Sequence, residues 1–327
     1  MQNIEANTSP RQSLPRIRVA AAILFNEQNE VLIDQRIDGR YPGQWEFPGG
    51  KIETGETARQ ALVRELQEEV GVVADEGAFK PLIQLHYVYE AYELSLEFFT
   101  ASIFTGTPYG KEGQPVRWVG RNELPTIDFL PTNTPVLRAL QLPDTCLITP
   151  EPPQQVAFLE TLEQVLQQGV RMLQFRAKSL NQQDYTELAE KVIDLAQGYQ
   201  AKVLLNSPFI LPDNAHGLHL TAQQLMALEQ RPALATHQML SASCHTTQEL
   251  LQASKVGVDF AFLSPVKATR SHPQVTPIGW YQFLENIGRI NIPVYALGGM
   301  TEADIPVALE HGAQGVAAIS ALWNRNK

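Results

Sequence analysis

The chain has 327 residues, of which 44% are hydrophobic and 18% charged, the composition of a globular protein long enough for two domains. Its formal net charge of -10 argues against binding a nucleic-acid polymer, because such binding relies on Lys and Arg side chains at the phosphates. Two cysteines without a CxxC pair argue against a disulfide framework, and the lack of an apolar run of ~18 residues argues against a membrane span. The N-terminal segment is polar, which argues against a secretory signal. We therefore expect a mobile tail at residues 1–15 and a cytoplasmic enzyme.

The first part of the chain predicts strands arranged around two helices. Apolar and β-branched residues predict strands at 17–25, 31–35, 82–89 and 94–104. A strong helix is expected at 57–70, because it ends before Gly71, a residue suited to the position after a helix. A second helix is expected at 134–140. This order of elements indicates an α+β domain over residues 16–141.

From residue 145 onward, short apolar strands alternate with helical stretches. Amphipathic segments such as 156–168, 183–197 and 302–310 separate the strands. Eight strands are expected, at 145–148, 171–176, 202–206, 217–220, 239–242, 260–263, 294–297 and 316–319. A strand–helix alternation repeated eight times is the pattern of a (β/α)8 TIM barrel, here over residues 145–327. Because about 180 residues is short for that fold, its loops are expected to be tight.

The helix at 57–70 carries three carboxylates on one face. Glu65, Glu68 and Glu69 are spaced i, i+3 and i+4 and therefore project together, where ionised carboxylates repel one another. A hard divalent cation such as Mg²⁺ removes that cost, because it prefers oxygen ligands. Gly49 and Gly50 let the preceding backbone come close to a ligand, so the Gly50 carbonyl could join the metal shell. For the three glutamates alone, a solvated acidic helix face is the alternative.

The spacing around this helix favours the metal site. The specified positions of the Nudix box are all filled, by Gly50, Glu56, Arg64, Glu65, Leu66, Glu68, Glu69, Gly71 and Val72. Arg64 can also pair with Glu56, about two turns back, and hold the cluster in place. The segment therefore resembles the Nudix hydrolases. The resemblance implies an α/β/α sandwich with a mixed sheet and a Mg²⁺ site, with Mn²⁺ as a possible substitute.

Similarity over about residues 17–140 extends to the MutT subfamily, the 8-oxo-dGTP diphosphatases. It is carried by residues 45–53, 110–115 and 131–136. In that family an Asn at the Asn133 position reads the oxidised purine base, which suits an amide that both donates and accepts. A Glu at the Glu112 position reaches the metal site as ligand or base. Taken alone, Asn133 could simply cap the helix that follows, a role that need not conflict with base recognition.

The same resemblance places further residues and implies a reaction. An Arg at the Arg36 position and a Phe at the Phe47 position lie in the nucleoside pocket of that family. The reaction is metal-assisted hydrolysis of a nucleoside triphosphate to the monophosphate and pyrophosphate. The metal ligands would be Gly50, Glu65, Glu68, Glu69 and Glu112. The catalytic group would consist of these four glutamates together with Glu56 and Arg64.

The later strands resemble the thiamine phosphate synthase and TenI-like family over about residues 145–323. The matching residues follow the C-terminal ends of strands, where barrel active sites form. They include Gln174, Arg176, Lys178, His219, Ser243, His245, Ser264, Gly298, Gly299 and Ser320. The backbone around Gly298, Gly299 and Ser320 is placed to hold a phosphate. A TenI-like barrel would use this phosphate cup, with His245 as an acid–base group and a thiazole or thiamine phosphate as ligand.

Two positions depart from the synthases of this family. Those enzymes hold Mg²⁺ with an Asp after the third strand and another after the fourth, whereas the corresponding positions here are the neutral Ser207 and Gln224. We therefore expect the barrel to bind a phosphate without synthase activity. A purely structural or regulatory barrel stays open, with His245 as a structural histidine and Arg176 and Lys178 in ion pairs inside the barrel.

Three hypotheses for function follow. In the first, the N-terminal domain removes 8-oxo-dGTP from the nucleotide pool and so prevents DNA damage. In the second, both domains serve thiamine metabolism and the Nudix site hydrolyses a thiamine-like diphosphate. In the third, the barrel is a non-catalytic sensor or dimerisation module, although the sequence specifies no oligomeric state. The match around Asn133 and residues 111–113 favours the first hypothesis.

Overall fold

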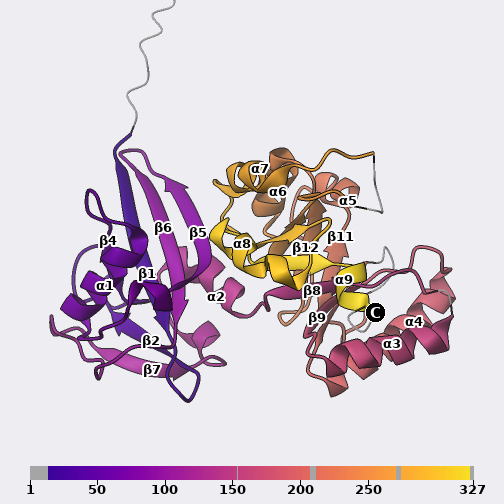
Figure 1. Ribbon diagram of the computed structural model, residues 1–327, viewed down its shortest axis with the longest axis horizontal. Coiled ribbons are helices and arrows are strands. Elements are labelled where there is room, and N and C mark those ends of the chain that lie inside the picture. The colour runs from indigo at the N-terminus through magenta and orange to yellow at the C-terminus, as the bar shows by residue number, and fades with distance from the viewer. Residues whose placement is uncertain (1–13, 153, 207–210, 270–273, 325–327) are drawn as a thin grey trace, which may run out of the picture.

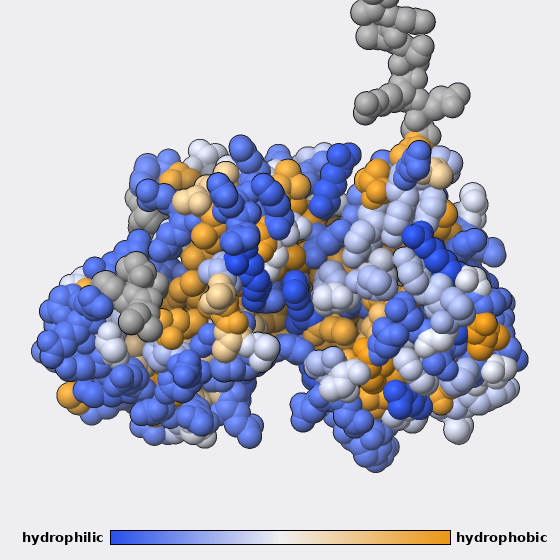
Figure 2. All heavy atoms as spheres, turned by 180° about the vertical axis from the view of Figure 1, so that it is seen from behind, coloured by the Kyte–Doolittle hydropathy of each residue, from blue (hydrophilic) through white to orange (hydrophobic). Residues whose placement is uncertain are grey.

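The computed structural model describes residues 14–152, 154–206, 211–269 and 274–324. These residues form two domains that lie side by side (Figure 1). Viewed from behind, a notch separates the two domains along the lower edge (Figure 2). Most of the expected tail and Ser207 lie outside the described residues. Among the described helices, none combines the length and the apolar character that crossing a membrane requires.

The N-terminal domain contains two sheets. In the first, β1 lies between β4 and β6, parallel to β6 and antiparallel to β4, and β5 forms the outer edge. Its strands are β1 (Arg16–Leu24), β4 (Gly49–Lys51), β5 (Lys80–Val88) and β6 (Glu93–Ala101). In the second sheet β2 lies between two antiparallel partners. Its strands are β2 (Glu30–Gln35), β3 (Trp45–Glu46) and β7 (Val116–Gly120).

Helices pack on both faces of the mixed sheet because successive side chains of β1 point to opposite sides. Ala20 and Ala22 join one buried cluster with residues of α1 (Ala58–Glu69). Ala21 and Ile23 join another cluster with residues of α2 (Thr134–Leu140). The expected α/β/α sandwich is therefore confirmed. Short 3₁₀ turns complete the domain at η1 (Glu76–Ala78), η2 (Leu124–Thr126) and η3 (Pro131–Asn133).

Helix α1 has well-defined ends. The Thr57 side chain accepts from the Gln60 backbone N–H, and the Gln60 side chain accepts from the Thr57 N–H, which together make a capping box. After Glu69 the chain reaches Gly71 in a left-handed conformation, with φ at 69°, which glycine adopts without strain. These local signals explain why the sequence predicts this helix to within a residue at each end.

The C-terminal domain is a closed parallel barrel whose strands follow one another in chain order. The strands are β8 (Thr145–Ile148), β9 (Met172–Phe175), β10 (Lys202–Leu205), β11 (Gly217–Leu220), β12 (Met239–Cys244), β13 (Phe260–Leu263), β14 (Val294–Leu297) and β15 (Gly315–Ala318). All eight strands that the sequence predicts are present, and the TIM barrel is confirmed. Side chains such as Met172, Leu204, Phe260 and Phe262 pack in one buried cluster contributed by several strands.

The helices around the barrel are short after the first two. They are α3 (Gln155–Gln167), α4 (Gln182–Gly198), α5 (Ala222–Met226), α6 (Thr247–Val256), α7 (Gly279–Ile287), α8 (Ile305–Glu310) and α9 (Ser320–Trp323), with η4 (Glu302–Asp304) before α8. The described residues between β10 and β11, at 206 and 211–216, contain no helix. The expected alternation is therefore incomplete at that point, where Pro212, Asp213 and Asn214 favour turns.

Two side chains of the barrel hydrogen-bond to backbone groups in and just after the N-terminal domain. Gln314, which is buried, donates from Nε2 to the carbonyl oxygens of Ala139 and Leu142 at 3.2 and 3.3 Å. The Asn291 amide accepts from the His86 N–H and donates to the His86 carbonyl, both at 2.8 Å. Asn291 therefore pairs with the open edge of β5 as a neighbouring strand would.

Candidate active site on the first domain

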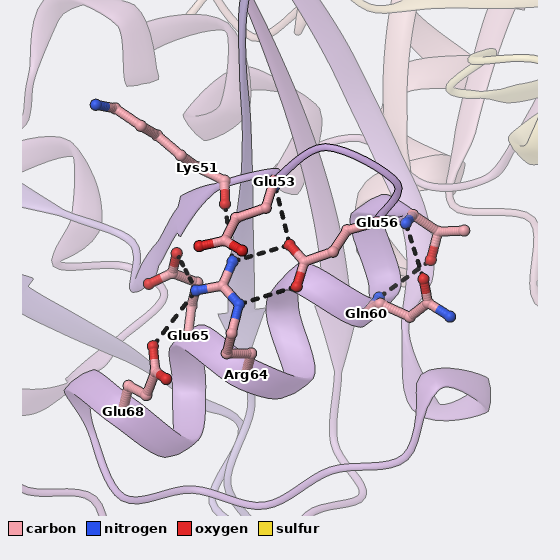
Figure 3. A network of polar contacts seen from close by, with 8 residues as sticks. Lys51, Glu53, Glu56, Gln60, Arg64, Glu65 and Glu68 are labelled. Atoms are coloured by element: carbon pink, nitrogen blue, oxygen red, sulfur yellow. Dashed lines mark hydrogen bonds and ion pairs between the residues drawn. The ribbon is translucent and has the colours of Figure 1, made fainter.

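The Arg64 guanidinium is the centre of a carboxylate network (Figure 3). Its Nε and Nη2 atoms donate to the two Glu56 oxygens at 2.9 Å each, so the expected pair is present. Nη1 donates to Glu65 at 2.8 Å and to Glu68 at 3.4 Å, and Nη2 also reaches the Lys51 carbonyl at 3.0 Å. The hydrogen bond from Arg64 lowers the pKa of Glu56 to about 2. This network ties the turn after β4 to the exposed face of α1.

Two glycines let β4 pass close to β1 and α1. A Cβ on Gly50 would lie 2.2 Å from the Glu65 Cδ and within 2.4 Å of both carboxylate oxygens. A Cβ on Gly49, whose φ is 149°, would lie 2.2 Å from the Ala20 carbonyl oxygen. Only glycine fits either position without movement of a neighbour. The structure therefore places the Gly50 backbone directly against the Glu65 carboxylate.

Glu69 is partly buried, as Glu65 is, whereas Glu68 is exposed. Burial raises the pKa of Glu69 to about 7, and the nearby charges of Glu65, Glu112 and Glu46 add to that effect. The Gly49 N–H, which donates to the Glu69 carboxylate, acts in the opposite direction. Several carboxylates therefore share a partly dehydrated space, where mutual repulsion disfavours full ionisation.

A loop after β6 brings Glu112 to this space. The Lys111 N–H and the Gln114 Nε2 both donate to the Glu69 carbonyl, at 2.9 and 3.1 Å. Lys111 Nζ donates to the Gln67 carbonyl at 2.8 Å, and the Glu112 N–H donates to the Gln114 side chain at 3.0 Å. The loop is thus fastened to the last turn of α1, which satisfies carbonyls that a helix end leaves open.

Two acidic residues near this space were not among the candidates from sequence. Asp34, on β2, is 7% exposed, and its Oδ1 has no hydrogen-bond partner. Burial, followed by the charges of Glu46 and Glu69, raises its pKa to about 8. Burial also raises the pKa of Glu46, while Arg36 opposes that shift. The sequence signal that could have identified Asp34 is a single carboxylate inside an apolar strand, because buried strands rarely carry an unpaired charge.

Within the described residues, no three His, Cys, Asp or Glu side chains are arranged to hold a metal ion. One reason is visible in Figure 3, where Arg64 binds Glu65 and Glu68. The donor types still fit a hard cation, because carboxylate oxygens gather here around Glu69 and the buried Asp34 oxygen has no donor to satisfy it. The predicted roles of the carboxylates as ligands stay predictions.

Asn133 is a buried amide without a structural partner. It is 3% exposed, and its Nδ2 atom has no hydrogen-bond partner. Although it immediately precedes α2, its side chain makes no capping hydrogen bond. Asn133 therefore occupies the N-cap position of α2, as the alternative expected, but its side chain does not do the capping. A buried amide group left unpaired costs stability and calls for an explanation, such as a ligand that completes it.

The other two nucleoside-pocket candidates have mainly protein neighbours. The Phe47 ring is 3% exposed, stacked on Phe129 at 5.2 Å and edge-on to Phe98 at 6.3 Å between centroids. Arg36 Nη1 donates to both Glu46 oxygens at 2.9 Å, and its buried Nε has no partner. Phe47 thus forms part of an aromatic core, and Arg36 is held by a carboxylate beside the acidic cluster.

All seven candidate residues of the barrel line two cavities at the C-terminal ends of its strands. The larger cavity has a volume of about 490 Å³ and is lined by Gln174, Arg176, Lys178, His245 and Gly298, among others. A second cavity of about 460 Å³ is lined by Gly298, Gly299 and Ser320, among others. The two cavities share Thr269, Leu297, Gly298 and Ile319, so they adjoin at the mouth of the barrel.

Three polar side chains of the barrel have defined partners. His245 Nδ1 lies 3.0 Å from the Ser264 carbonyl oxygen and 3.2 Å from the Ser264 hydroxyl, and the tautomer of the ring sets which of the two it binds. His219 is buried, with Ser241 and Ser243 hydroxyls 2.8 Å from its two ring nitrogens, and burial lowers its pKa to about 3. Gln224 caps α5 through the Thr221 backbone and hydroxyl.

Comparisons with known proteins separate along the same boundary. A family model described as NUDIX domain matches residues 15–140, and one described as Thiamine monophosphate synthase matches residues 145–322. The 8-oxo-dGTP diphosphatase of Escherichia coli is 41% identical over 129 residues, which are 39% of this chain and 98% of that protein. The corresponding protein of Haemophilus influenzae is 38% identical over 38% of this chain and 90% of its own. A putative thiamine-phosphate synthase of Aquifex aeolicus is 38% identical over 183 residues, 55% of this chain and 98% of that protein.

Proposed function

We propose that the first domain of this chain, which belongs to the NUDIX family through residues 15–140, converts 8-oxo-dGTP to 8-oxo-dGMP and pyrophosphate. Through residues 145–322 the chain belongs to the thiamine monophosphate synthase family. As a NUDIX member with 8-oxo-dGTP diphosphatases among its relatives, this domain is a hydrolase that acts on phosphoanhydride bonds. The proposal adds the substrate and a role in keeping oxidised nucleotides out of DNA.

The unpartnered amide of Asn133 carries the choice of substrate. Guanine presents two acceptors, O6 and N7, on this edge. In 8-oxoguanine N7 bears a hydrogen, so the same edge presents one acceptor and one donor. An Asn amide offers a donor and an acceptor side by side and matches the oxidised base at both positions. Opposite guanine, one of the two positions would set acceptor against acceptor, which leaves buried polar groups unpaired.

The metal that the NUDIX family generally needs fits the acidic face of α1. Gly50, Glu65, Glu68, Glu69 and Glu112 would hold it, and a bound Mg²⁺ would neutralise phosphate charge and activate a water molecule. Arg64 holds Glu65 on the helix and Glu56 in the turn before the helix in fixed positions. The hydrogen bonds of Lys111 and Gln114 hold the Glu112 loop against the same helix.

Replacement of Glu69 tests the assignment of the carboxylates. We expect Glu69→Ala to lower kcat/KM for 8-oxo-dGTP by a factor of 100 or more, with the melting temperature preserved, because removing a charge from a crowded cluster relieves repulsion. Glu76→Ala, which removes an exposed carboxylate from η1, is the matched control and should be active. Near-normal turnover in Glu69→Ala would remove Glu69 from the metal site.

For the barrel, we propose binding of a phosphate ester at the mouth, without synthase activity. The supporting observation is the backbone turn at Gly298 and Gly299, which borders both cavities and has positive φ values of 96° and 67°. Consecutive backbone N–H groups in such turns form concave anion sites. Arg176 and Lys178, which also line the larger cavity, supply positive charge.

A further inference from the structure

A carboxylate of this chain occupies a set of anion-binding groups beside the barrel mouth, next to Arg176 and Lys178, which line the larger cavity. Glu151, in the loop after β8, accepts through Oε1 from the Lys178 N–H at 3.2 Å and from Arg176 Nη1 at 3.3 Å. Its Oε2 accepts from the Ser179 N–H at 3.2 Å and from the Ser179 hydroxyl at 3.0 Å. Two consecutive backbone N–H groups, a hydroxyl and a guanidinium therefore converge on one anion, as they do in phosphate sites.

The carboxylate is held in its ionised form. Burial raises the pKa of Glu151, but the hydrogen bonds from Ser179 and Lys178, together with the Arg176 charge, lower it below its usual value. Four donors match the four lone-pair positions of a carboxylate, so its hydrogen-bonding capacity is filled. An incoming phosphate at this position would have to displace Glu151 or lie beside its negative charge.

The charges at the mouth leave little capacity for a second phosphate. Among the described residues that line the two cavities, Arg176 and Lys178 are the only Arg or Lys side chains, and none is Asp or Glu. Glu151 offsets one of these two positive charges through its ion pair with Arg176. Among these described lining residues, a diphosphate therefore meets neither two free cations nor a carboxylate that could hold Mg²⁺ for it. The glycine turn at Gly298 takes no part in the ion pair between Glu151 and Arg176, so it stays available for one phosphate group.

We propose that Glu151 determines the specificity of the barrel mouth, because it fills the anion position beside Arg176 and Lys178 and so admits ligands with one phosphate group while excluding diphosphates. This inference rests on the proposal that the barrel binds a phosphate ester. It deepens that proposal by naming the class of ligand and the residue that selects it. In the alternative, Glu151 only stabilises the fold, by joining the loop after β8 to the loop between β9 and α4.

The test compares inorganic phosphate and inorganic pyrophosphate on the full chain. Calorimetric titration in the presence of a chelator gives both dissociation constants, and amide hydrogen exchange of residues 174–180 and 297–301 shows whether the anion binds at the mouth. The variants are Glu151→Gln, which keeps an acceptor but removes the charge, and the double variant Glu151→Gln with Arg176→Gln. Glu160→Gln, an exposed position on α3, is the matched control. Any binding at the first domain is common to all variants and cancels.

We expect the wild type to bind pyrophosphate no more tightly than phosphate at the mouth. Glu151→Gln should lower the pyrophosphate dissociation constant at least tenfold and change the phosphate constant less than threefold, and the double variant should lose that gain. Phosphate binding with an unchanged ratio in Glu151→Gln, or a gain that persists without Arg176, would overturn the role of Glu151 alone. Absence of both anions from the mouth in every variant would overturn the phosphate-ester proposal itself.

Discussion

Replacement of Asn133 by Ala should separate base recognition from folding. The Asn133 side chain is 3% exposed, makes no helix cap, and has an Nδ2 atom without a partner. Removing it therefore breaks no hydrogen bond of Nδ2 and leaves no donor unpaired. The free energy of unfolding should change by about 1 kcal/mol or less, because eliminating an unsatisfied buried polar group offsets the small loss of packing.

The expected loss is in the choice between substrates. A bidentate contact to a base edge is worth about 1–3 kcal/mol of discrimination. The ratio of kcat/KM for 8-oxo-dGTP over dGTP should therefore fall by about fivefold to 150-fold in Asn133→Ala. The fall should come from the oxidised substrate, since only that base matches both amide groups.

The assay measures pyrophosphate release from both nucleotides over a range of substrate concentrations, beside urea unfolding of each variant. Asn122→Ala, an exposed asparagine of the same domain, is the control and should keep the wild-type ratio. An unchanged ratio in Asn133→Ala would refute the assignment of this residue to base recognition. Equal losses for both nucleotides, together with a large loss of stability, would show that Asn133 serves the fold.

Three further perturbations have outcomes set by the structure. Gly50→Ala places a Cβ 2.2 Å from the Glu65 Cδ, so that flexible carboxylate must move; we expect kcat/KM to fall tenfold or more with little change in melting temperature, and near-normal activity would count against the site. Gln314→Ala leaves two buried carbonyls without their donor and should lower the urea-unfolding free energy by about 1–3 kcal/mol, whereas no change would show that this contact is dispensable. Burial lowers the pKa of His219 from 6.5 to about 3, so the unfolded chain takes up a proton at this histidine before the folded chain does as the pH falls. The stability that the neutral buried ring contributes is therefore complete above pH 6.5 and is lost progressively towards pH 3. Wild-type stability should therefore fall between pH 6.5 and 5 by up to about 2 kcal/mol more than that of His219→Gln, and parallel pH profiles in denaturant titrations would contradict this.

Local sequence signals explain why much of the fold is predictable. The capping box at Thr57 and the left-handed Gly71 define α1 within the sequence itself. The barrel strands are short apolar runs at regular intervals, so each is recognisable without its partners. Strands β3 and β4 are only two and three residues long, and their pairing is set by β2 and β1 rather than by a local pattern. Residues so few carry no periodicity to read.

The site was predictable where residues share one helix and not where they meet through tertiary contacts. Glu65 and Glu69 lie one turn apart, so their spacing alone places them together. Asp34 and Glu46 reach the same acidic space from the second sheet, and their arrangement depends on how β2 and β3 pair. Glu151 likewise meets its donors on the loop after the neighbouring strand β9, 25 or more residues away in the chain.

The measurement that tests the central claim most directly is a comparison of 8-oxo-dGTP, dGTP and thiamine diphosphate as substrates of the full chain with Mg²⁺. Initial rates with direct detection of the released phosphate or pyrophosphate give kcat/KM for each. We predict a large preference for 8-oxo-dGTP over dGTP and little turnover of thiamine diphosphate. Weak hydrolysis of 8-oxo-dGTP with a clear preference for thiamine diphosphate would contradict this account, and would mean that the two domains share a pathway and that Asn133 does not read an oxidised base.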